Sequence, residues 1–305
     1  MRTRTARIVH VIVAVALFAA GTGCGGEKTV DGRVPRAREV EQDPKAAARA
    51  RQVADAWDGS AAAEAWRTGF HPMGDAVELP EDAFRTEADK EVYATQNFVL
   101  RGTLPATPRK DGLVKWASGG SLALPLWEAR KAYESVARGR NDGPRLTVTR
   151  ARLGEMTLAT NRGPATVPAW LFTLEGYDTP LKRVALSPSK PPRAPIRPAP
   201  ETRDYQMGPL GGLVRVAGKG RSVTVMAEHG ACDDGPAVHV LETAGSVVLS
   251  ASILGTDDGP CTTQAIGEKV TVTLKRPLGD RVLLDACTGR PVPYQQRFGA
   301  SPSPR

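Results

Sequence analysis

The spacing of apolar residues in the first half of the chain is helical in several places. Four apolar residues recur at this spacing between residues 44 and 57, directly after Asp43 and Pro44, a pair that is typical of a helix start. Ser60 can cap a second, shorter helix. We predict four helices, over residues 44–57, 60–66, 80–90 and 126–137.

After residue 143 the apolar period changes from about 3.6 to 2, which indicates strands separated by turns. Trp170, Phe172 and Leu174 alternate along one predicted strand, so we expect this face to pack on the helices. Pro168 lacks an amide hydrogen and suggests that this strand lies at an edge or carries a bulge. The predicted strands cover residues 96–104, 113–117, 145–149, 155–160, 167–175, 181–186, 213–216, 222–228, 237–242, 246–253, 269–275 and 281–285.

A proline-rich stretch divides the two groups of strands. It cannot continue a sheet and favours an extended polyproline conformation, so we interpret it as a spacer; a recognition site for a partner is the alternative. The fold class predicted is α+β: a mixed helix and antiparallel-sheet domain, then a small antiparallel all-β, sandwich-like domain. The expected organisation is a signal peptide (1–23), a flexible stalk (24–43), an α+β domain (44–187), a linker (188–202), a β domain (203–296) and a disordered tail (297–305).

The first residues have the pattern of an export signal, with three arginines followed by an apolar run from Ile8 to Ala20. That run is shorter than the roughly 20 residues a membrane-spanning helix needs. Residues 21–24, Gly-Thr-Gly-Cys, resemble the lipobox of bacterial lipoproteins, although that pattern has a larger aliphatic residue in place of Gly21. The resemblance implies cleavage before Cys24 and a lipid on its sulfur, in the form of acyl chains such as palmitate, which would anchor the chain stably in the cell membrane.

Composition agrees with a globular protein, with 41% hydrophobic and 24% charged residues. The formal net charge is +8, and loss of Arg2, Arg4 and Arg7 with the leader would leave about +5. These charges are spread along the chain rather than clustered beside aromatic residues, so we expect no nucleic-acid partner. An envelope protein or a wall polymer is the expected partner class, beside the membrane lipid at the anchor.

Three cysteines remain if Cys24 carries lipid, in an oxidising compartment where pairing is expected. Cys232 and Cys261 lie beside two Asp-Asp-Gly-Pro turns in mirrored order, which suggests the same end of a sheet. We predict a disulfide between them, with Cys287 buried and unpaired; a pairing that uses Cys287 is the alternative.

A metal site would compete with this disulfide. His229 with the three cysteines could hold zinc or copper, and the turn aspartates could bind calcium if the turns meet, but neither set has the spacing of a known site. Asp at the start of a tight turn needs no ligand to explain it. We therefore expect no cofactor and keep as metal candidates only His229, Asp233, Asp234, Asp257 and Asp258.

The sequence contains neither a Gly-x-Ser-x-Gly elbow nor a His-Glu-x-x-His pair, so no catalytic residue is assigned. The stretches 163–170 and 277–285, with Cys232 and Cys261, resemble uncharacterised secreted lipoproteins of high-GC Gram-positive, actinobacterial type. That resemblance implies a lipid anchor at the extracellular face of the cell membrane. We expect a non-enzymatic binding or interaction protein; an envelope hydrolase and a transporter-associated solute-binding lipoprotein are the alternatives.

Overall fold

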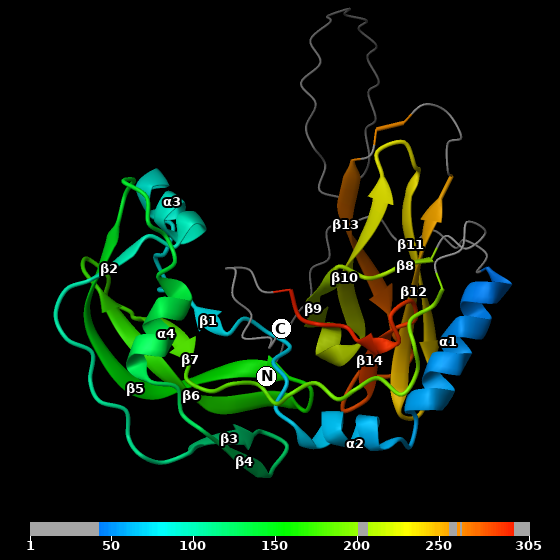
Figure 1. The fold of residues 1–305 in the computed structure, drawn as a ribbon, viewed down its shortest axis with the longest axis horizontal. Coiled ribbons are helices and arrows are strands. Elements are labelled where there is room, and N and C mark those ends of the chain that lie inside the picture. The colour runs from blue at the N-terminus through cyan, green and yellow to red at the C-terminus, as the bar shows by residue number, and fades with distance from the viewer. Residues whose placement is uncertain (1–42, 201–206, 256–260, 263, 296–305) are drawn as a thin grey trace, which may run out of the picture. The chain divides into compact units, whose positions relative to one another are not determined.

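The computed structural model describes residues 43–200, 207–255, 261–262 and 264–295. Cys24 and the predicted signal peptide, stalk and tail lie outside these residues. The described part combines helices with mostly antiparallel sheets, so the prediction of a mixed α+β fold is confirmed (Figure 1). Its helical elements are α1 (Pro44–Trp57), α2 (Ala61–Thr68), α3 (Glu87–Thr95), α4 (Ala129–Val136) and the 3₁₀ turn η1 (Gly218–Gly220).

Side-chain caps mark the start of α1, α2 and α3. Asp43 accepts a hydrogen bond from the amide of Lys45 at 2.7 Å, and Ser60 accepts one from Ala63 at 3.1 Å. Helix α3 begins later than predicted, because Thr86 caps it through the amide of Asp89. Among the helices in the described residues, none combines the length and apolar character that crossing a membrane requires.

A seven-stranded sheet forms the N-terminal half, in the order β1-β7-β6-β3-β4, with β5 on the other side of β6 and β2 beside β5. Its centre is the long β5–β6 hairpin, which is paired down to Thr160 and Gly163. One continuous strand therefore replaces the two predicted over residues 145–160, and β4 was not predicted. The strands are β1 (Val77–Glu78), β2 (Phe98–Leu100), β3 (Gly112–Trp116), β4 (Ser121–Leu124), β5 (Leu146–Thr160), β6 (Gly163–Leu174) and β7 (Leu181–Val184).

The two faces of this sheet bury separate clusters. Trp170, Phe172 and Leu174 pack with residues of α3 and α4, so the expected helix-covered face is confirmed. The opposite face buries Val167 and Leu171. The expectation that Pro168 marks an edge or bulge is wrong: β6 is central, and Pro168 lies between the residues that pair with β3 and those that pair with β7, where a missing amide hydrogen breaks no ladder.

Two sheets face each other in the C-terminal half and share one apolar core. One sheet has the order β13-β10-β9; the other has β11-β12-β14-β15, with β8 also on β12. The prediction of antiparallel pairing is wrong for two strand pairs: β12 and β14 pair in parallel after the chain crosses between the sheets, and β2 and β5 pair in parallel in the N-terminal sheet. The strands are β8 (Met207–Gly208), β9 (Gly212–Ala217), β10 (Ser222–Gly230), β11 (Gly235–Glu242), β12 (Ser246–Leu254), β13 (Ala265–Thr273), β14 (Val282–Asp285) and β15 (Arg290–Pro291).

Helix α1 packs on this second sheet rather than on the N-terminal one. Its buried side chains, Val53 and Trp57 among them, belong to the sandwich core, and α1 lies along β12 (Figure 1). The indole Nε1 of Trp57 donates a hydrogen bond to the carbonyl of Gly289 at 2.8 Å. Residues 246–251 of β12 are consecutively buried because the facing sheet covers one side of the strand and α1 the other.

The proline-rich stretch forms neither helix nor strand over residues 187–200. It is not a free spacer, because hydrogen bonds hold it at both ends: Ser189 donates its amide to the carbonyl of Phe70 at 2.8 Å, and Ala199 donates its amide to that of Cys287 at 2.7 Å. Ile196 packs against the sandwich core. Its role as a domain boundary stays a prediction.

Candidate binding groove

A groove of about 910 Å³ opens where four segments, far apart in the sequence, come together. We call it the junction groove. Its four main walls are the end of α2, the tip of the β5–β6 hairpin, the turn between β9 and β10, and the loop that precedes β14. Ser118, in the turn between β3 and β4, also lies on the lining. Its polar lining is Glu64, Arg67, Thr68, Ser118, Thr160, Arg162, Lys219 and Asp280; its apolar lining includes Met73, Pro164, Val216, Pro277 and Leu278.

Asn161 fixes the hairpin tip against the end of α2. Its side chain is buried; Oδ1 accepts a hydrogen bond from the amide of His71 at 3.1 Å, and Nδ2 donates to the carbonyls of Trp66 and Gly69 at 2.5 and 3.2 Å. A buried amide that is satisfied at both ends tolerates little displacement. One wall of the groove is therefore tied to another by specific contacts.

The same corner holds a buried histidine. The rings of His71 and Trp66 are stacked with their centroids 4.1 Å apart and an angle of 6° between their planes. Burial lowers the pKa of His71 to about 4. The imidazole is therefore neutral near pH 7, which suits its apolar neighbour.

Arg162 is held over the indole of Trp116, with Cζ 3.8 Å from the ring centroid. The hydroxyl of Thr160 orients both residues: it accepts from Trp116 Nε1 at 3.0 Å and from the amide of Arg162 at 3.2 Å. Because the ring covers one face of the guanidinium, the N–H groups in its plane remain the ones that can bind.

Lys219 has a left-handed backbone, with φ 54° and ψ 38°. It lies between Gly218 and Gly220, whose φ angles are 58° and 85°. A side chain in this region costs roughly 1–2 kcal/mol, and glycine is the residue that adopts it without this cost. A lysine between two glycines is thus the least favourable of the three for the turn, and it is the one that carries a charge into the groove.

Arg281 holds the loop that forms the fourth wall. Its Nη2 donates to the carbonyls of Arg276 and Pro277 at 2.9 Å each, and its Nε donates to Leu278 at 3.3 Å. Its Nη1 binds Glu242 Oε2 at 2.8 Å. Burial alone would raise the pKa of Glu242, but hydrogen bonds from the amides of Lys275 and Arg276 and from Arg281 lower it.

The charged residues of the lining differ in whether they form ion pairs. Arg67 binds Glu64 at 3.1 Å, whereas Arg162, Lys219 and Asp280 form no ion pair within the part of the chain that the structure describes. The groove thus offers two available cations and one available carboxylate beside an apolar wall. Few polar groups in a mostly apolar concavity are typical of a ligand site.

The predicted disulfide is present: Cys232 and Cys261 are bonded, with their Cα atoms 6.0 Å apart. Cys287 takes no part in this bond, as predicted. It is half-buried rather than buried, and its Sγ donates a weak hydrogen bond to the carbonyl of Met207 at 3.7 Å.

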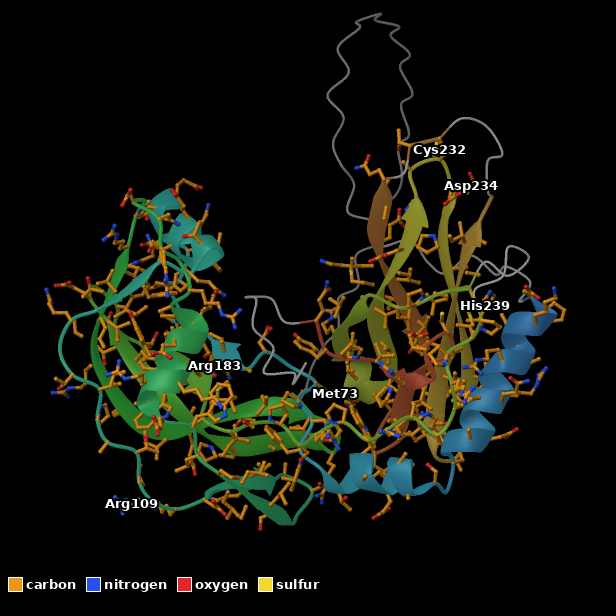
Figure 2. The ribbon with its side chains drawn as sticks, in the orientation of Figure 1. Met73, Arg109, Arg183, Cys232, Asp234 and His239 are labelled. Carbon is orange, nitrogen blue, oxygen red and sulfur yellow. A yellow bond between two sulfur atoms is a disulfide. The ribbon has the colours of Figure 1, made fainter. Side chains whose placement is uncertain are left out.

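The metal candidates that lie in the described residues, His229, Asp233 and Asp234, do not come together at one site. His229 faces Glu268, with Nε2 3.3 Å from Oε1, while Asp233 accepts a hydrogen bond from the amide of Gly230 at 2.6 Å. Asp234 is exposed at the same end of the sandwich as Cys232 (Figure 2). Asp257 and Asp258 lie outside the described residues, and within those residues no three His, Cys, Asp or Glu side chains form a group that could hold a metal ion.

A second groove, of about 700 Å³, lies between residues 74–85 and the strand β5. It is acidic, with Asp75, Glu78, Glu81 and Asp82 in its lining, and Lys182 neutralises Glu78 at 2.6 Å. Acidic residues on one exposed segment are common without a ligand. We therefore take the junction groove as the candidate site.

No protein-family model matches this chain, and no curated protein or solved structure is significantly similar to it. Sequence reasoning missed the junction groove entirely. Its turns were visible as Gly-rich and Pro-rich stretches, but only the folded chain shows that 160–164, 218–220 and 277–280 meet.

Proposed function

We propose that this chain is a lipid-anchored, non-enzymatic binding protein at the extracellular face of a bacterial cell membrane, and that its ligand binds in the junction groove. One observation carries the proposal: four distant segments converge on a concavity whose walls are tied by buried hydrogen bonds of Asn161 and Arg281. A pre-formed site is what binding requires, since little ordering remains to be done when the ligand arrives.

Binding suits the lining better than acyl transfer does. The residues that line the groove in the described part of the chain include no histidine or cysteine that could serve as base or nucleophile. Of the two carboxylates, Glu64 is bound by Arg67. The lining instead supplies donors and an apolar surface, which hold a molecule without changing it.

The anchor is tested by fractionating cells that express the full chain or its Cys24→Ser variant. We expect the parent protein in the membrane fraction, and the variant released and unprocessed, because two acyl chains are needed for stable attachment. A Cys24→Ser variant that is processed and sediments with membranes like the parent would contradict the lipid anchor.

The ligand site is tested by filling the groove. Ser118 is exposed on its lining, so Ser118→Trp should block it, whereas Ser121→Trp places the same bulk on β4 outside the lining. Native mass spectrometry of protein purified from envelopes should show a bound small molecule in the parent and in Ser121→Trp but not in Ser118→Trp. Equal occupancy of the two variants, or an unliganded parent, would argue against the groove. Release of the molecule in a chemically altered form would argue for catalysis.

A further inference from the structure

We propose that the junction groove selects an organic anion with an apolar tail, whose acidic headgroup is bound by Arg162 and Lys219. This inference rests on the proposed function, because it names the class of ligand for the same groove. Three properties of the lining carry it: the supply of unpaired positive charge, the way each cation is held, and the position of the apolar wall.

The first property is the charge that the fold leaves available. Of the three cations on the lining, only Arg67 has an ion pair among the described residues, with Glu64. A single remaining carboxylate, Asp280, lies on the lining with the other two cations. One acidic headgroup can therefore be bound, while a long polyanion would meet Asp280 as well.

The second property is preorganisation. The Trp116 ring and the Thr160 hydroxyl hold Arg162, so little side-chain freedom is lost when its N–H groups bind oxygen. Lys219 is presented by a left-handed turn in which a glycine would be less strained.

The third property is the apolar surface next to these cations. Val216 is half-buried, and Pro164 and Pro277 are exposed. Together they form an apolar wall in the groove, in front of the buried side chains of Met73 and Leu278. A ligand that carried only an inorganic anion would leave this wall exposed to water, whereas a hydrocarbon tail would cover it.

Isothermal titration calorimetry with four ten-carbon probes, each below its micelle concentration, tests the inference. Decyl phosphate and decanoate share an anionic head, decyltrimethylammonium is cationic, and decyl maltoside is uncharged. We expect at least one anionic probe to bind the full chain at least about tenfold more tightly than the cationic and uncharged probes. The two anionic probes distinguish a phosphate from a carboxylate headgroup.

Two substitutions separate binding from folding. Lys219→Gly removes the charge and suits the backbone, so we expect binding of the anionic probe to weaken about tenfold while the melting temperature stays the same or rises. Lys219→Arg should retain binding, and Arg162→Gln should weaken it. Unchanged binding in both Lys219→Gly and Arg162→Gln would overturn the inference.

The two proposals fail differently. If the cationic or uncharged probe binds as tightly as the anionic ones and Ser118→Trp abolishes this binding, the groove is a binding site but the anion selectivity is wrong. If no probe binds the parent at millimolar concentration, the anion inference is overturned, and the native mass spectrometry of the blocked groove decides the proposed function alone.

Discussion

The N-terminal sheet and the C-terminal sandwich each bury one arginine, and they do so in different ways. Arg183 on β7 is 1% exposed, and Arg281, just before β14, is 7% exposed. Both therefore lose most of their hydration. The groups that replace the water are neutral in the first case and include a carboxylate in the second.

Arg183 contacts α4 through Ser135. Its Nε donates to Ser135 Oγ at 2.9 Å, its Nη1 donates to backbone carbonyls, and its guanidinium lies 4.8 Å from the centre of the Trp127 ring. Within the described residues Nη2 has no hydrogen-bond partner. Burial, with the nearby charge of Arg138, lowers the pKa of Arg183 to about 10, so the charged form is disfavoured where it lies.

Arg281 instead binds Glu242 and three carbonyls of the loop 276–278. The pair has side-chain exposures of 5% and 10%. Desolvation of two charges is offset here by their attraction and by hydrogen bonds that use the remaining donors. A buried arginine is thus held without a carboxylate partner in the N-terminal sheet, whereas in the sandwich an ion pair and backbone carbonyls fix it and its loop.

The largest effect is expected from Arg281→Met. This substitution leaves the buried carboxylate of Glu242 without its ion-pair partner and removes the hydrogen bonds that hold the loop 276–278. We therefore expect a loss of about 3–5 kcal/mol in the free energy of unfolding, measured with urea. The double variant Arg281→Met with Glu242→Leu should recover a large part of that loss. A single variant as stable as the parent would show that the ion pair contributes nothing.

The Cys232–Cys261 disulfide also stabilises the sandwich. Replacing Cys232 and Cys261 by Ala removes a cross-link over a sequence separation of 29 and should cost about 3 kcal/mol. Hydrogen exchange should accelerate in β10 and β13 but not in β5 and β6. Cys287→Ala is the matched control and should leave exchange unchanged. Equal acceleration in both halves would mean that they unfold as one unit.

His71, at the junction, makes stability depend on pH. Its folded pKa of about 4 lies below the ordinary 6.5, so its contribution is complete above pH 6.5 and is lost as the pH falls toward 4. Between pH 7 and pH 5 we expect a loss of about 2 kcal/mol. His71→Phe keeps an aromatic ring against Trp66 and should remove this part of the pH dependence; a parallel pH profile would assign it to other groups.

The smallest effect is expected from Arg183→Met. Replacing a buried charge that has only neutral partners by an apolar side chain of similar length should change the free energy of unfolding by less than about 1 kcal/mol, in either direction. Urea unfolding beside Arg281→Met makes the contrast direct. A loss as large as that of Arg281→Met would show that the hydrogen bonds to Ser135 and the backbone outweigh the burial of the charge.

The sequence identified elements that local chemistry decides. Helices α1 and α2 begin at Asp43 and Ser60, whose caps are readable residue by residue. The helix-covered face of β6 follows from the alternation of Trp170, Phe172 and Leu174. The Cys232–Cys261 bond was predicted from two Asp-Asp-Gly-Pro stretches in mirrored order beside the cysteines, and the structure contains it.

The sequence did not predict which strands pair or which distant segments come together. Strand β4 follows a Gly-Gly turn but has too few apolar residues to predict, and its place is set by β3. The predicted α+β domain (44–187) includes α1, but the apolar stripe of a helix does not say which sheet it will cover, and α1 packs on the sandwich. The junction groove depends on Asn161 and Arg281, two polar residues whose burial no local pattern announces.

The packing of α1 on β12 also sets an order of events during synthesis. The two elements are about 190 residues apart, so α1 leaves the ribosome long before its sheet exists, while Val53 and Trp57 lack the surface that buries them. The strands of the N-terminal sheet all lie within residues 77–184, so this sheet does not depend on a segment synthesised much later. We therefore expect this sheet to fold before the sandwich, and the first helix of the chain to be among the last elements to pack.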